Sequence, residues 1–157
     1  MQLPIWQPFI NEWYTFALFL LFIFILIGIS EFAQSILRWN PEFTRKLVHL
    51  FVGTIVSACP FIFKSNIPPI LLAGIFIFIN ALALKTDKFK GIHSTDRFSY
   101  GTVYFPIAFL ILALFWWEKP ITLILSMLIM TFSDTIAAFI GERTTQPRQF
   151  QIWEDIK

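Results

Sequence analysis

The chain has 157 residues, of which 57% are hydrophobic and only 14% charged, and its mean hydropathy is +0.69. Soluble domains carry about 25% charged residues, so this composition excludes an ordinary soluble domain and predicts an integral membrane protein. The formal net charge of +2 gives no indication of a nucleic-acid partner, and the single cysteine, Cys59, excludes an internal disulfide.

Five apolar runs follow one another along the chain. A helical span needs about 20 residues, with a range of roughly 17 to 25. The runs cover residues 13–37, 47–63, 67–84, 102–117 and 121–140. We therefore expect an all-α integral membrane protein, with residues 1–157 forming a single polytopic domain, a bundle of about five transmembrane helices.

The first run, 13–37, is interpreted as a span rather than a cleaved signal peptide. It lacks a basic start, its apolar core is too long, and no small-residue cleavage site follows it. The second and third runs are separated only by residues 64–66, which predicts a tight helical hairpin. Pro68 and Pro69 favour the start of its second helix, where a missing N–H does no harm.

The basic residues predict the orientation of the bundle, because Lys and Arg are enriched in cytoplasmic loops. Every Lys and Arg except Lys64 and Lys119 lies between the first and second runs, between the third and fourth, or after the fifth. These segments all emerge on one face. We therefore expect an outer N-terminus and a cytoplasmic C-terminus.

Polar residues gather near this face, beginning with Glu31 at the inner end of the first run. The stretch RKLVHLFVG then places Arg45, Lys46 and His49 on one side of the first turn of the second helix, with Gly53 further along the same stripe. Attraction to anionic headgroups would explain the cations alone, and Glu31 could simply reach water. A histidine in the same turn favours a binding site.

A second polar segment, HSTDRFSYGTVYFP, precedes the fourth run. Backbone N–H groups at a helix start favour anions, so Gly101 and Thr102 are candidates for holding one. Arg97 could add a charge-assisted hydrogen bond to a phosphate. A solvated polar loop is the alternative interpretation.

The fifth run contains an acid, Asp134, in MTFSDTIAAFIGER. It lies on the order of 10 Å below the inner surface at 1.5 Å per residue, where an ionised carboxylate needs a partner. Ala138 and Gly141 continue its stripe and permit the close approach of a helix or a ligand. A structural hydrogen bond is the alternative to a functional role. Together, these residues provide cations and a helix start that can bind an anion, and a carboxylate that can hold Mg²⁺. These are the groups that phosphoryl transfer requires.

These motifs resemble the polyprenol kinase family, which includes dolichol kinase, phytol kinase and the CTP-dependent diacylglycerol kinases. SEFAQSILRWNPEFTRKLVHLFVG is similar to the family's Glu followed by R-K-x-x-H-x-x-x-G. SYGTVYFP is similar to its G-T motif, and SDTIAAFIG to its D-x-x-A-x-x-x-G motif, which phosphatidate cytidylyltransferases share in looser form. The resemblance covers about residues 30 to 157.

The resemblance implies roles for individual residues. It implies that Asp134 binds Mg²⁺ and the nucleotide phosphates, that the nucleotide is CTP, and that the acceptor is a lipid alcohol. Arg45, Lys46 and His49 would be the other catalytic residues. The nucleotide- or substrate-binding residues that we expect are Glu31, Arg97, Gly101, Thr102, Gly141 and Arg143.

The chain departs from the family pattern after Gly141. It reads ERTTQPRQFQIWEDIK, without the second glycine of the family's short basic loop. The family also continues beyond the position of Lys157 with a further motif and further spans, so we expect a C-terminally truncated member.

Three functions follow from this sequence. The first is a kinase that uses CTP to phosphorylate a polyprenol, phytol or diacylglycerol at the cytoplasmic face. The second is a phosphatidate cytidylyltransferase. The third is a transporter or an inactive subunit, in which Asp134, Asn80 and Glu31 would line a path. A homo-oligomer is compatible with each of them.

Overall fold

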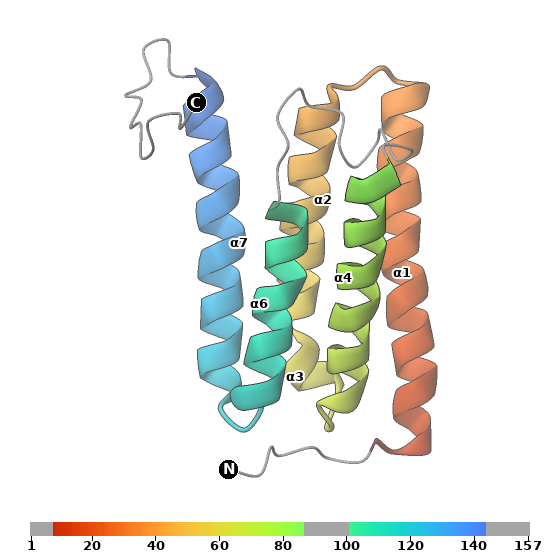
Figure 1. The fold of residues 1–157 in the computed structure, drawn as a ribbon, viewed down its shortest axis with the longest axis vertical. Helices are drawn as coiled ribbons and strands as arrows, with labels where there is room; N and C mark the ends of the chain where they lie inside the picture. Colours follow the sequence, from red (N-terminus) through yellow and green to blue (C-terminus); the bar gives the residue numbers. More distant parts are fainter. Residues whose placement is uncertain (1–7, 87–100, 144–157) are drawn as a thin grey trace.

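The computed structural model describes residues 8–86 and 101–143, and within these ranges the chain forms helices joined by short connections and no strands (Figure 1). The helices alternate in direction along the bundle. α1, α4 and α7 end, and α2 and α6 begin, at the same end, which we call the polar end. The helices are α1 (Ile10–Ser35), α2 (Pro41–Ser57), α3 (Cys59–Ile62), α4 (Ile67–Thr86), α6 (Gly101–Phe115) and α7 (Pro120–Arg143).

Within the part of the chain that the structure describes, two helices are long and apolar enough to cross a membrane, at Ile10–Ser35 and Pro120–Gly141. Two shorter helical segments, Ile67–Leu82 and Thr102–Phe115, are apolar as well. The all-helical class with membrane-spanning candidates is therefore confirmed, whereas five spans and the orientation of the termini stay predictions.

The predicted run 47–63 is not a single helix. α2 begins at Pro41, ahead of the apolar run, because the charged turn with Arg45 and Lys46 is also helical. α2 ends at Ser57, and the short helix α3 begins at Cys59. Pro60 lies in the first turn of α3, where its missing N–H breaks the hydrogen-bond ladder of a longer helix but suits a new start.

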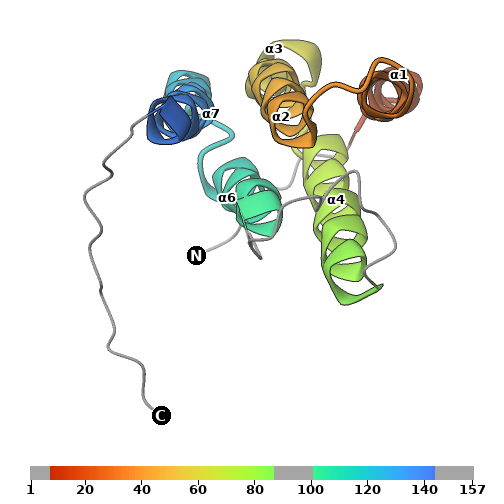
Figure 2. The ribbon, with the colours of Figure 1, turned by 90° about the horizontal axis from the view of Figure 1, so that it is seen from above.

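The helices pack in pairs around a shared interior (Figure 2). α4 packs mainly on α6 and α2 mainly on α7, while α1 lies against α2 and α4, and α6 and α7 touch each other little. The most buried apolar side chains lie toward the end opposite the polar end, and include Phe63, Leu123 and Met127. Away from this core the helices leave room for a cavity.

The predicted hairpin turn at residues 64–66 is held by Glu12, whose side chain is buried at the opposite end of the bundle. The Glu12 carboxylate accepts hydrogen bonds from the backbone N–H of Lys64 at 2.6 Å and of Ser65 at 3.1 Å, and from the Ser65 hydroxyl at 2.7 Å. Trp117 Nε1 donates to the Lys64 carbonyl at 3.2 Å. These bonds tie the start of α1 and the end of α6 to the hairpin turn.

Glu12→Ala is expected to lower the unfolding temperature in detergent, because it leaves the N–H groups of Lys64 and Ser65 without an acceptor. Each unsatisfied buried group costs about 1–3 kcal/mol. Glu118→Ala is the matched control, since Glu118 is an exposed acid at the same end. Equal unfolding temperatures for the two variants would show that the Glu12 hydrogen bonds do not hold the turn.

Candidate functional site

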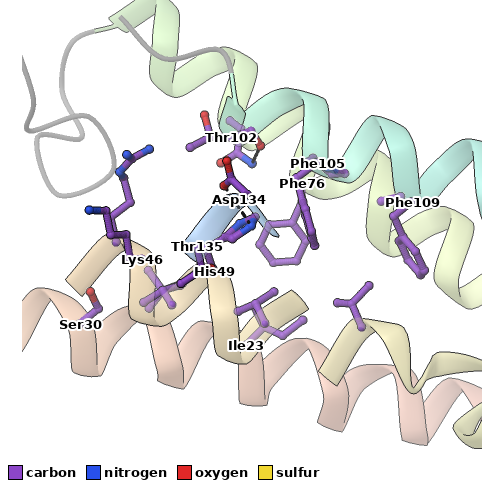
Figure 3. A pocket seen from close by; sticks show the side chains of 18 of the residues that line it. Ile23, Ser30, Lys46, His49, Phe76, Thr102, Phe105, Phe109, Asp134 and Thr135 are labelled. Atoms are coloured by element: carbon purple, nitrogen blue, oxygen red, sulfur yellow. Dashed lines mark hydrogen bonds and ion pairs between the residues drawn. The ribbon is translucent and has the colours of Figure 1, made fainter. Parts of the chain in front are cut away.

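A cavity of about 250 Å³ lies between α1, α2, α4, α6 and α7 (Figure 3). Its wall near the polar end is made of polar and charged side chains, while its deeper wall is apolar. The polar wall comprises Ser30, Glu31, Arg45, Lys46, His49, Asn80, Thr102, Asp134 and Thr135. The motifs that the sequence analysis singled out on α1, α2, α6 and α7 therefore meet in one cavity.

His49 and Asp134 face each other across the cavity from α2 and α7. The distance from His49 Nε2 to Asp134 Oδ2 is 3.4 Å. The Phe105 ring of α6 contacts the imidazole edge-on, with ring centroids 4.6 Å apart, and so restricts its orientation. The Asp134 side chain is 72% exposed, so the cavity is open at this carboxylate. A substrate can reach the pair from outside.

The cations of α2 also line the cavity. Lys46 is only 4% exposed, and its ammonium lies 4.9 Å from the centroid of the Phe139 ring. A cation over an aromatic face is stabilised by about 0.5–2 kcal/mol. Arg45 lines the same wall. Two positive charges therefore stand beside the His49–Asp134 pair, as an anionic substrate would require.

The start of α6 is fixed at the cavity by Asn80 of α4. Asn80 Nδ2 donates to the backbone carbonyl of Thr102 at 2.9 Å. The Thr102 hydroxyl is buried and has no hydrogen-bond partner within the part of the chain that the structure describes. Because Thr102 lines the cavity, this hydroxyl is available to a bound ligand. Asn80, which the sequence suggested only for a transport path, is thus a positioning residue.

The remaining predicted residues differ in their placement. Glu31 and Ala138 line the cavity, and Gly101 begins α6. Gly141 lies on α7, and no atom of the described chain would come within 4 Å of a Cβ there, so no described helix approaches closely at Gly141. Arg97 lies outside the described residues, and Arg143 ends α7 with a side chain that is not described.

The described residues contain no group of three His, Cys, Asp or Glu side chains that would form a protein-only metal cage. Mg²⁺, however, is commonly held by one or two carboxylates together with substrate phosphates and water. Asp134 is an open carboxylate on the cavity. The donor set therefore fits a Mg²⁺ ion that arrives with a phosphate.

No protein-family model matches the chain, and no solved structure matches it. A curated phytol kinase of Synechocystis sp. is 26% identical over 136 residues, which is 83% of this chain and 57% of that protein. The chain thus spans little more than half of this relative's length. This similarity indicates a distant relationship to the polyprenol kinase family and hints at a kinase-like function on a lipid.

Proposed function

We propose that the chain forms the catalytic cavity of a lipid-alcohol kinase, which transfers a phosphoryl group from a nucleoside triphosphate to a lipid alcohol. The observation that carries this proposal is the cavity itself, which has charged groups at one end and apolar walls at the other. A lipid alcohol has the same two parts, a hydroxyl and a hydrocarbon chain. The distant similarity to a phytol kinase supports the same assignment.

Five groups of the polar wall have a direct role in this proposal. Lys46 and Arg45 attract the triphosphate and neutralise charge that develops in the transition state. The Thr102 hydroxyl donates to a phosphate oxygen. Asp134 receives the proton of the acceptor hydroxyl, and His49 orients the Asp134 carboxylate through the 3.4 Å contact.

The chemical step is a simple displacement. The acceptor oxygen forms a bond to the terminal phosphorus as the bond from that phosphorus to the bridging oxygen breaks. The nucleoside diphosphate leaves, and the hydroxyl proton passes to Asp134. Mg²⁺, held by Asp134 and the phosphates, would supply further charge neutralisation.

The finer parts of the proposal come from the sequence. The resemblance to the polyprenol kinase family points to CTP as the donor. The distribution of Lys and Arg points to a multi-pass protein with the polar end at the cytoplasmic face. Arg97 would add a cation at that face.

Transfer of label distinguishes this function from its rivals. Membranes that contain the protein are incubated with Mg²⁺ and with phytol, a polyprenol or diacylglycerol. The CTP is labelled in either its γ-phosphate or its α-phosphate. We expect the γ-label to appear in a phosphorylated lipid, whereas α-label in the lipid with release of pyrophosphate would indicate a cytidylyltransferase instead. Absence of both products with every alcohol and nucleotide would contradict the proposed function.

A further inference from the structure

The deep, apolar wall of the cavity has a defined set of residues that the proposed chemistry does not use. We call these five buried side chains, which come from α1, α2, α4 and α6, the cavity floor. They are Ile23, Val56, Leu72, Ala73 and Phe109. None of them is polar, so the floor can only recognise the size and shape of a hydrocarbon.

The depth of the floor can be estimated from three helices, and the three estimates agree. Each helix carries one residue of the polar wall and one floor residue seven positions away, namely His49 and Val56, Asn80 and Ala73, and Thr102 and Phe109. At 1.5 Å per residue, the floor lies about 10 Å from the polar wall. Beyond it the interior is filled by the buried side chains of Phe63 and Leu123.

The cavity is small compared with a lipid. An apolar cavity of about 150 Å³ holds a benzene ring, so this cavity of about 250 Å³ holds a group of roughly eight to ten non-hydrogen atoms. This is enough for the first part of one hydrocarbon chain but not for two chains side by side. α7 contributes nothing to the floor and touches α6 little, so the rest of a longer chain can leave along the seam between α6 and α7.

We propose that the cavity floor selects the acceptor by the shape of about the first eight positions after its hydroxyl. This inference rests on the proposed function, which places the hydroxyl at Asp134. Alcohols with one chain enter the cavity, and alcohols that divide into two chains close to the hydroxyl are excluded. Chain length beyond the floor has little effect, because that part of the chain lies outside the cavity.

The proposal is tested by filling the cavity floor with a larger side chain and comparing the phosphorylation of different acceptor alcohols. Ala73→Phe places a ring in the floor, and Ala81→Phe places the same ring on the exposed side of α4, away from the cavity. We expect Ala73→Phe to lower phosphorylation of phytol and of longer prenyl alcohols by about tenfold or more, the scale of hydrophobic-pocket discrimination. A five-carbon prenyl alcohol should be affected much less, and Ala81→Phe should match the wild type with every acceptor.

Binding is measured separately from transfer, with a photoreactive single-chain alcohol that carries a diazirine about six carbons from its hydroxyl. We expect the label on floor residues of α4 or α6, and its loss in Ala73→Phe but not in Ala81→Phe. If floor residues are labelled but no phosphoryl group is transferred, the binding site is supported and only the proposed function is overturned.

Three results would overturn the selection by the floor. One is equal labelling and equal acceptor preference in the wild type and Ala73→Phe. A second is a wild-type protein that phosphorylates diacylglycerol as readily as phytol. Phe109→Leu enlarges the floor instead of filling it and should raise the rate with diacylglycerol relative to phytol; no change in that ratio would also contradict the proposal.

Discussion

Asp134→Asn is expected to abolish phosphoryl transfer to a lipid alcohol while leaving the protein folded in the membrane. Asparagine has the same shape as aspartate but cannot take the acceptor proton at neutral pH and carries no charge for a metal-bound phosphate. A positioned proton acceptor accounts for about 10²- to 10⁴-fold in rate. We therefore expect a loss of at least this size in the transfer of label from CTP.

Because Asp134 is exposed, its catalytic role can be distinguished from a structural role by measuring activity and stability separately. Its side chain is 72% exposed, so the substitution buries no unsatisfied group and the unfolding temperature in detergent should not change. Ser133→Ala is the matched control, because Ser133 is also exposed but does not line the cavity. Full activity in Asp134→Asn, or a large drop in its unfolding temperature, would remove Asp134 from the proposed chemistry.

Gly53→Ala is expected to destabilise the protein and to reduce activity, because it forces α2 away from α7. A Cβ at Gly53 would overlap the Oγ1 and Cγ2 atoms of Thr131. The Thr131 side chain cannot move aside easily, since it is fully buried and its hydroxyl donates to the Met127 carbonyl at 2.7 Å. Overpacking of this kind costs about 1–3 kcal/mol, and it acts one turn from His49.

Two further variants test this explanation of Gly53. Gly74→Ala on α4 should be tolerated, because no atom lies within 4 Å of a Cβ at that position. Thr131→Ala removes two of the overlapping atoms, so it should restore part of the stability lost in Gly53→Ala. Additive losses in the double variant, measured as unfolding temperatures, would show that helix separation is not the cause.

The sequence was sufficient to predict the helices and much of the cavity. The apolar runs gave each long helix, because burial in a bilayer or a bundle needs continuous apolar segments. The charge distribution placed the polar motifs on a single face, and in the structure Glu31, Arg45, Lys46, His49, Thr102 and Asp134 line one cavity. Hydropathy alone does not mark the break between α2 and α3, but Pro60, a helix breaker, lies beside it.

Other contacts could not be predicted because their residues have no distinctive pattern. Phe105 and Phe139 hold His49 and Lys46, but they are two of 20 phenylalanines in the chain. Glu12 lies before the first apolar run, and its partners, Lys64 and Ser65, are far away in sequence. Such pairings depend on how the helices are arranged, which local sequence does not specify.

The convergence of His49 and Asp134 is the claim on which the cavity and its chemistry depend. It is tested by introducing His49→Cys and Asp134→Cys into a Cys59→Ala background, with a protease site between α4 and α6, and adding a short thiol cross-linker. We expect the two halves to stay joined after cleavage, whereas the halves of a control variant with His49→Cys and Glu118→Cys, at opposite ends of the bundle, should separate. Separation of the halves in the first pair as well would contradict a shared site.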